Sequence, residues 1–465
     1  MAGRDNTPSR GRGRVANEQR LLALGDAIDR RAGGPSRPPR RRPNARGWRG
    51  WTNQRRLVVV AGTLALVVAV IAGGGYLYAQ YQFGKVKKID VANEVAPISG
   101  APVNILAIGS DSRVGLTGQE ARQSGSGSVT GQRSDVVKII HLDPKTGSIS
   151  MISIPRDTLV TLVGNQSLYG NFNRINVNLI PSNANPVGDP SLLVKTIEAN
   201  FGIPINYTIV VGFAGLINAA VALGGVYLDF PYPSVDDHSG LRIYHPGCQL
   251  VTGFQALAIA RSRHFFWLPH GRVSPATLPR GWDNVDGAAY SILTHRGWLY
   301  DGTSDWGRIL RQDAFLRALA SRAKATYNPL KLNSFLSALP QGIELDRSLS
   351  LNTLISIALR FHNLNPAAIH QYTLPTQSGN SPVGSALFVS QPQAQEQLVS
   401  VFGTQLQQPT NPPPNLSMHS VPPPYVPVTT TTVPRHHKKN ATTTTVPLGP
   451  GADQASYYDP VPCTP

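Results

Sequence analysis

The sequence predicts an α/β domain that follows one membrane-spanning helix and is flanked by two non-globular tails. Three observations lead to this prediction. Short apolar runs alternate with helical stretches from residue 103 to residue 260, which is typical of an α/β domain with a largely internal sheet. One long uncharged apolar stretch precedes them. Both ends of the chain lack the apolar residues that a core requires.

The first 56 residues form a strongly basic segment. They hold 15 Arg against 4 Asp and Glu, a net charge of +11 out of +17 for the whole chain of 465 residues. Because such a composition cannot offset chain entropy by burial, we expect a disordered tail. The basic pI is therefore mostly a property of this tail.

The stretch Leu57 to Tyr78 has 22 consecutive residues without a charge and follows Arg55 and Arg56. At about 1.5 Å per residue it is long enough to span a hydrocarbon core of about 30 Å. A signal peptide is the alternative, but this stretch exceeds an h-region of about 7–15 residues and no small-x-small site follows. We expect a single-pass anchor with the basic tail in the cytoplasm and the rest of the chain outside the cell membrane.

A polar connector, residues 79–102, leads to the main domain, residues 103–330, with residues 331–407 as its C-terminal part. The expected strands are Val103–Ile108, Val136–Leu142, Ile149–Ile154, Tyr207–Val211 and Val226–Phe230, and the expected helices are Ser191–Asn200, Ala214–Leu223 and Gly253–Ala260. Residues 408–465 are rich in Pro and Thr, which predicts a non-globular tail. The two cysteines, Cys248 and Cys463, exclude a disulfide-rich mini-protein. The residues alone leave open whether they pair with each other.

Charged residues cluster where the expected strands end. Asp111 and Arg113 follow the first strand, Arg133 and Asp135 precede the second, and Arg156 and Asp157 follow the third. Ligands of open α/β sheets bind beyond strand ends. Arginine matches phosphate oxygens with a planar fork and stays charged when desolvated, and paired Asp oxygens suit Mg²⁺.

Further along the chain, Arg261, Arg263, Arg308, Arg311 and Gln312 extend this set. If they line the same site, positive charge exceeds negative charge there, which suits a pyrophosphate. The alternatives are local turn residues, surface ion pairs of little energetic value, or a solvated face of a helix or strand.

Seven motifs in order resemble the LytR-CpsA-Psr family over about residues 103–330. They are Asn104 to Arg113, Arg133 to Asp135, Ile152 to Asp157, Arg174 to Asn176, Leu223 to Val226, Ala256 to Arg263 and Asp305 to Gln312. The resemblance implies a single α-β-α sandwich domain with a central mixed sheet. It also implies a phosphotransferase that moves a glycopolymer from a polyprenyl-pyrophosphate carrier to peptidoglycan, in an extracytoplasmic domain anchored to the membrane.

The resemblance also assigns roles to residues. Asp111 and Asp135 would hold Mg²⁺, and Arg133, Arg156 and Asp135 would be catalytic. The pyrophosphate would be bound by Arg113, Arg133, Arg156, Arg261, Arg263, Arg308, Arg311 and Gln312. Asp135 and Asp157 both remain candidates for the proton acceptor.

The chain departs from the family pattern at residues 264–304, an insertion between Arg263 and Asp305. It is rich in aromatic residues and histidine, including Phe265, Phe266, Trp267, Trp282 and Trp298. One interpretation is a surface insertion without function. The other is a lid or acceptor platform, since exposed aromatic rings stack on sugars and long loops are often functional.

Two rival classes of function remain. A membrane-anchored transcriptional regulator would use the basic tail to bind nucleic acid, but the tail has no helix-turn-helix pattern and topology explains its charge, so no nucleic-acid partner is expected. A polyprenyl-phosphate-binding protein without transferase activity would bind the carrier lipid and perform no phosphorus chemistry. A hydrolase that releases phosphate when no acceptor is present is also conceivable. The sequence does not identify the glycopolymer.

Overall fold

The structure is a computed structural model, and part of the chain is described. The described residues are 19–25, 27, 52–113, 116, 133–164, 166–179, 190–274, 277–278, 292–325, 337–338, 340, 342–414 and 460–464. The chain divides into two compact units, residues 1–73 and 74–465. Most of the expected disordered tail, residues 1–56, lies outside the described residues, but residues 19–25 within it are helical and exposed.

The long helix α2 (Asn53–Gly84) contains the predicted span 57–78 and extends past both of its ends. It is long and apolar enough to cross a membrane. Its uninterrupted run follows from the absence of Pro and of charge after Arg56. The helix begins in the first unit and ends in the second, where Ala79 and Phe83 pack into the core of the domain.

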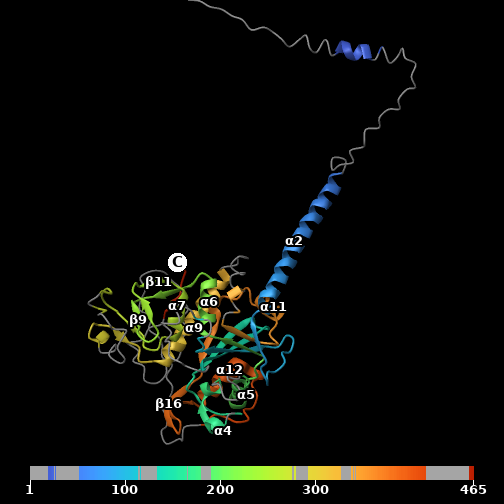
Figure 1. The fold of residues 1–465 in the computed structure, drawn as a ribbon. Helices are drawn as coiled ribbons and strands as arrows, with labels where there is room; N and C mark the ends of the chain where they lie inside the picture. The colour runs from blue at the N-terminus through green and yellow to red at the C-terminus, as the bar shows by residue number, and fades with distance from the viewer. Residues whose placement is uncertain are drawn as a thin grey trace, which may run out of the picture. The chain divides into compact units, whose positions relative to one another are not determined.

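A seven-stranded mixed sheet forms the centre of the second unit (Figure 1). Its order is β1-β14-β7-β2-β3-β4-β15. The strands are β1 (Lys87–Ile89), β2 (Val103–Ser110), β3 (Ser134–Asp143), β4 (Ser148–Ile154), β7 (Tyr207–Val211), β14 (Ile343–Asp346) and β15 (His370–Thr373). The predicted α/β class with a central mixed sheet is confirmed. One expected strand, Val226–Phe230, forms as β8 but joins a different sheet.

Helices cover both faces of this sheet, which makes three layers. On one face, side chains such as Leu106, Ile139 and Ile152 form a core with α5 (Pro190–Phe201) and α12 (Gln393–Phe402). The opposite face packs on α11 (Leu351–Arg360) and, through Lys138, on α9 (Asp305–Ala325). Alternation along β3 explains the two-sided burial, since successive side chains point to opposite faces.

A separate apolar core beside the sheet contains side chains of α6 (Phe213–Ala222), α7 (Gly253–Arg261) and α9. Two small sheets complete this part of the domain. The first, in the order β10-β9-β12-β13, contains Leu241–Ile243, Ser234–Asp236, Phe266–Trp267 and Leu299–Tyr300. The second, in the order β11-β8-β18, contains Gly247–Val251, Val226–Phe230 and Val461–Pro462.

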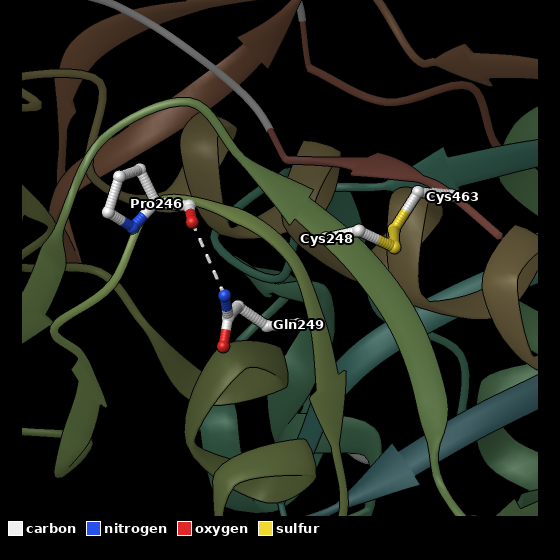
Figure 2. Close-up of a disulfide and its surroundings, with 4 residues drawn as sticks. All are labelled: Pro246, Cys248, Gln249 and Cys463. Carbon is white, nitrogen blue, oxygen red and sulfur yellow. Dashed lines mark hydrogen bonds between the residues drawn. A yellow bond between two sulfur atoms is a disulfide. The ribbon is translucent and has the colours of Figure 1, made fainter. Parts of the chain in front are cut away.

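The described ends of the predicted C-terminal tail belong to the folded domain, which corrects the expectation of a non-globular segment from residue 408 onward. The backbone oxygen of Pro412 accepts a hydrogen bond from Thr161, and the Asn411 amide donates to Ala199. Strand β18 pairs with β8, and Cys463 forms a disulfide with Cys248 of β11, with Cα atoms 6.0 Å apart (Figure 2). The remainder of the Pro/Thr segment, residues 415–459, lies outside the described residues.

The remaining elements connect these layers. They are α4 (Gln166–Tyr169), the 3-10 helices η2 (Ile175–Leu179), η3 (Pro366–Ala368) and η4 (Gly403–Gln405), the hairpin β16 (Thr376–Ser381) with β17 (Gly384–Val389), and the pair β5 (Leu159–Thr161) with β6 (Phe172–Arg174).

Candidate functional site

Strand register brings the first three charged motifs to one end of the central sheet. Strands β2 and β3 are antiparallel, as are β3 and β4, so the end of β2, the start of β3 and the end of β4 coincide. Asp111, Asp135 and Arg156 stand at these three positions. The Arg156 Nη1 donates to Asp135 Oδ1 at 2.6 Å. The convergence that the sequence predicted for these motifs is therefore present.

The backbone holds Asp111 and Asp135 close to each other. Asp111 Oδ1 accepts a hydrogen bond of 2.9 Å from the Arg133 amide, and the Asp135 amide donates to the Arg133 carbonyl at 3.0 Å. Burial, and to a lesser degree the charge of Asp135, raise the pKa of Asp111. Two carboxylates that destabilise each other in a partly desolvated place fit a divalent cation with a preference for oxygen ligands. The donor set is thus compatible with Mg²⁺.

The other arginines come from the end of α7 and the start of α9. Arg261 is the last residue of α7 and Arg263 lies two residues further on, so both leave the end of this helix. Arg308 lies in the first turn of α9 and donates to the Asp135 carbonyl at 2.8 Å. This bond joins the α9 arginines to the charged end of the sheet.

Asp305, the first residue of α9, is the shared partner of three guanidinium groups. Its Oδ1 lies 2.9 Å from Arg308 Nη2, 3.2 Å from Arg263 Nε and 3.9 Å from Arg156 Nε. A single carboxylate thus holds three arginines from three segments in one cluster. Asp305 stands in a motif of the sequence, but this role as shared partner was not among the predicted site functions.

The arginine cluster, defined as Arg156, Arg261, Arg263 and Arg308, contains buried nitrogens that make no hydrogen bond. Within the part of the chain that the structure describes, these are Arg156 Nε, Arg261 Nη1, Arg263 Nε and Arg308 Nε, although Arg156 Nε and Arg263 Nε lie within ion-pair distance of Asp157 and Asp305. A buried donor without an acceptor costs free energy, and more so when it is charged. Such a set can donate hydrogen bonds to the oxygens of an anionic ligand.

The surroundings shift the pKa values of these arginines in different directions. Burial lowers the pKa of Arg308, and the neighbouring Arg156 and Arg263 lower it further against Asp305 and Asp135. Burial and Arg113 lower the pKa of Arg261, which also lies over the ring of Phe213 at 4.9 Å. Burial opposes the charge on Arg156, but Asp135, Asp305 and Asp157 raise its pKa. Mutual repulsion among desolvated cations is relieved when an anion binds between them.

Two other predicted pyrophosphate ligands, Arg311 and Gln312, are occupied inside the fold. The side chain of Arg311 is fully buried, with Nη1 2.7 Å from Asp301 Oδ2 and Nη2 3.1 Å from the Ser262 carbonyl, and it stacks on Phe265. Gln312 donates to the Ala260 carbonyl at 2.8 Å. Their side chains brace the turn that carries Arg261 and Arg263. Direct contact of these two residues with a pyrophosphate stays a prediction.

Asp236 on β9 is a supporting residue that sequence reasoning missed. It is fully buried, and its Oδ2 accepts hydrogen bonds from Ser262 Oγ and from the amides of Arg263 and His264 at 2.6–2.9 Å. The Asp236-Asp237-His238 sequence was the only available signal, and it resembles a surface turn. Asp236 fixes the backbone from which the Arg263 side chain leaves.

Gly307 is required by the Asp301–Arg311 ion pair. A Cβ atom at this position would overlap the Asp301 carboxylate, the Thr303 hydroxyl and the Arg311 guanidinium. The glycine between Asp305 and Arg308 is therefore explained by close approach of side chains to the helix.

The described part of residues 264–304 fits neither a surface insertion nor a platform of exposed aromatic rings. Phe265, Phe266, Trp267 and Trp298 are all buried, so they are not surface rings that stack on sugars. Strand β12 pairs with β9, and Asp301 holds Arg311. The described part of this segment is structural core that supports the site. Trp282 lies outside the described residues.

Comparison with known proteins identifies the family. The model of the LytR_cpsA_psr family matches residues 78–266 and 280–401, about two thirds of the chain. The chain belongs to the LytR-CpsA-Psr family.

Curated relatives match over shorter segments. The chain is 32% identical to the probable cell wall biosynthesis protein LcpB of Corynebacterium glutamicum over 43% of this chain and 46% of that protein. It is 26% identical to the polyisoprenyl-teichoic acid–peptidoglycan teichoic acid transferase TagV of Bacillus subtilis over 62% of each. The matches thus span about half of the relatives' length.

Solved structures also align with part of the chain. The LytR-Csp2A-Psr enzyme from Actinomyces oris aligns with a TM-score of 0.47 at 20% identity, over 70% of this chain and 97% of that chain. Bacillus subtilis TagV aligns with a TM-score of 0.47 at 22% identity, over 66% and 98%.

Proposed function

We propose that the protein is a transferase that moves a glycopolymer from a polyprenyl-pyrophosphate carrier to peptidoglycan and forms a phosphodiester. Family membership and the relatives named as teichoic acid–peptidoglycan transferases support this proposal. The observation that carries it is the arginine cluster, in which each guanidinium has one buried nitrogen that makes no hydrogen bond among the described residues. A pyrophosphate has enough charged oxygens to accept hydrogen bonds from several arginines at once.

In the proposed reaction, a hydroxyl of the peptidoglycan acceptor attacks the phosphorus that bears the sugar. A new oxygen–phosphorus bond forms, the bridging oxygen–phosphorus bond breaks, and polyprenyl phosphate leaves with the bonding electrons. Arg156, Arg263 and Arg308 stabilise the charge that accumulates on the non-bridging and leaving oxygens. The hydroxyl proton passes to a carboxylate, either Asp135 or Asp157, which lie on either side of Arg156.

Asp111 and Asp135 would hold Mg²⁺, which when bound supplies polarisation of the phosphoryl oxygens. Arg113 and Arg133 flank these carboxylates; the charges of both lower the pKa of Asp111 against the effect of burial. Arg133 is the most exposed of the arginines around Asp111 and Asp135, so it would contact a ligand that arrives from solvent.

The helix α2 would anchor the protein in the cell membrane, with the domain on the outer side and the basic tail in the cytoplasm. A long apolar helix with Arg55 and Arg56 at its start supports this orientation. The polyprenyl substrate is itself embedded in the membrane. Anchoring would therefore keep the site and the carrier lipid at the same surface.

The test is a transfer assay with the full chain in vesicles, a polyprenyl-pyrophosphate oligosaccharide, peptidoglycan chains and Mg²⁺. Arg156→Ala removes a charged donor that faces the transferred phosphoryl group, so we expect the rate to fall by about 10²–10³-fold. Asp135→Ala should also abolish transfer. Thermal unfolding of both variants should stay close to that of the parent, since both side chains are partly exposed.

Arg347→Ala is the matched control, because Arg347 forms an exposed pair with Asp90 away from the cluster and should leave transfer unchanged. Equal transfer by the parent and Arg156→Ala would refute the proposed role. Binding of the carrier lipid with no turnover by the parent would favour a lipid-binding protein without transferase activity.

A further inference from the structure

Helix α11 presents two different faces. Leu351, Leu354 and Ile357 point inward and pack in the core on the second face of the sheet. Ile355 and Leu359 point outward and are 38% and 65% exposed. Because they are four residues apart, they lie on one face of the helix, one turn above the other. This face leaves two large aliphatic side chains uncovered by the domain.

The N-terminal end of this face of α11 contacts helix α2. Asn352 lies three residues before Ile355 on this face, and its Oδ1 accepts a hydrogen bond of 2.9 Å from the hydroxyl of Tyr76 on α2. Ala79 and Phe83 of α2 share one apolar cluster with Leu354, Ile357 and Phe361. Figure 1 shows α11 beside the end of α2. The exposed stripe Asn352-Ile355-Leu359 therefore starts at α2.

The position of Tyr76 sets the depth of this stripe in the membrane. Tyr76 is two residues from Tyr78, the end of the predicted membrane span Leu57–Tyr78, a rise of about 3 Å. Tyrosine hydroxyls at such positions lie at the level of the lipid head groups. Asn352, which is bonded to that hydroxyl, lies at the same level. Ile355 and Leu359 share a helix face with Asn352 and are exposed.

The charges on and near α11 are those of a helix that binds an anionic bilayer. The ten residues of α11 include no acidic side chain, and the helix ends at the exposed Arg360. Lys85, with Nζ 4.1 Å from the Tyr81 ring centre, adds a cation at the base of α2. An amphipathic helix with aliphatic and basic side chains binds in the interface of an anionic bilayer.

We propose that α11 docks on the outer surface of the membrane and inserts Ile355 and Leu359 at the boundary of head groups and acyl chains. This second contact would fix the orientation of the domain above the bilayer, which α2 alone leaves free to rotate. The inference rests on the proposed anchoring by α2. It predicts a lipid surface, and not a protein, as the partner of this face.

The test uses nitroxide labels on the full chain in vesicles of phosphatidylcholine and phosphatidylglycerol. The label is placed at Ile355→Cys or Leu359→Cys, and at Val399→Cys as the matched control. Val399 is an aliphatic side chain on α12 with 50% exposure. The native cysteines are paired in a disulfide and do not compete for the label.

We expect accessibility to a water-soluble nickel reagent to be several-fold lower at residues 355 and 359 than at residue 399, and accessibility to oxygen to be higher. Equal nickel accessibility at all three positions, in chains that float with the vesicles, would overturn the inference. Protection that requires added membrane proteins would also overturn it, because it would indicate a protein partner. Chains that do not float would remove the anchoring on which it rests.

Transfer measured on the same labelled samples separates this inference from the proposed function. Transfer that continues while the labels are exposed to water would contradict docking and leave the proposed function intact. Protected labels without transfer in any sample would support docking and count against the transferase.

Discussion

Arg308 and Arg311 lie one turn apart on α9, and their surroundings differ. Arg311 is fully buried, its two Nη groups bond to Asp301 and Ser262, and Phe265 covers its plane. Arg308 is also buried, but it shares its carboxylate, Asp305, with two further arginines, Arg156 and Arg263. The two arginines thus differ in their ion pairs: Arg311 has a buried carboxylate opposite it, whereas three arginines gather around the carboxylate of Arg308.

Breaking the Asp301–Arg311 ion pair should produce the largest effect on stability. Asp301→Ala leaves the buried Arg311 charge without its partner, so we expect the free energy of unfolding to fall by about 3–5 kcal/mol. Denaturant unfolding of the parent and the variant measures the difference. Asp90→Ala, which breaks the exposed pair with Arg347, is the control and should leave stability unchanged. A small loss in Asp301→Ala would mean that Arg311 is not held by this ion pair.

Gly307 tests the geometry of the same pair with an intermediate effect. An added methyl group would displace the Asp301 and Arg311 side chains, so Gly307→Ala should lower the free energy of unfolding by about 1–3 kcal/mol. Gly302→Ala is the matched control, because nothing lies within 4 Å of a Cβ atom there. Thermal unfolding of both variants measures the difference, and equal melting temperatures would contradict the close approach at Gly307.

Glu94 extends the comparison to a partly buried acid, and the expected effect is the smallest. Burial, and then a hydrogen bond with Asp346, raise the pKa of Glu94 to about 8, above its ordinary value of 4.5. The folded state therefore binds more protons than the unfolded state between these values, so stability declines as pH rises through this window.

Removing the titratable group of Glu94 should flatten this dependence. The melting temperature should fall less from about pH 5 to about pH 9 in Glu94→Gln than in the parent. Identical pH profiles of the two proteins would show that Glu94 does not contribute.

Much of the fold follows from sequence pattern. Both faces of the central sheet are buried, so its strands are continuous apolar runs, and these runs predicted the strands. The prediction that charged residues meet beyond the ends of β2 and β4 was correct for Asp111, Asp135 and Arg156, since antiparallel neighbours bring these positions to one end.

The parts that the sequence did not predict depend on contacts between distant segments. Whether an arginine is satisfied depends on which carbonyl or carboxylate lies opposite, and Asp301 and Ser262 take this position for Arg311 only in the folded chain. The aromatic residues of 264–304 were assigned to a surface because local sequence does not tell a buried ring from an exposed one. Pairing of Cys463 with Cys248 likewise depends on β18 adding to β8 across 215 residues of sequence.

The most direct test of the central claim is the affinity of the full chain for geranylgeranyl pyrophosphate with Mg²⁺, measured by calorimetry. Arg263 has a buried Nε that makes no hydrogen bond among the described residues and shares Asp305 with two other arginines, so Arg263→Met should weaken binding by about tenfold or more. Arg347→Met, at an exposed ion pair, should bind like the parent. Equal affinity of the parent and Arg263→Met, with the variant folded, would contradict the proposal that the arginine cluster forms the pyrophosphate site.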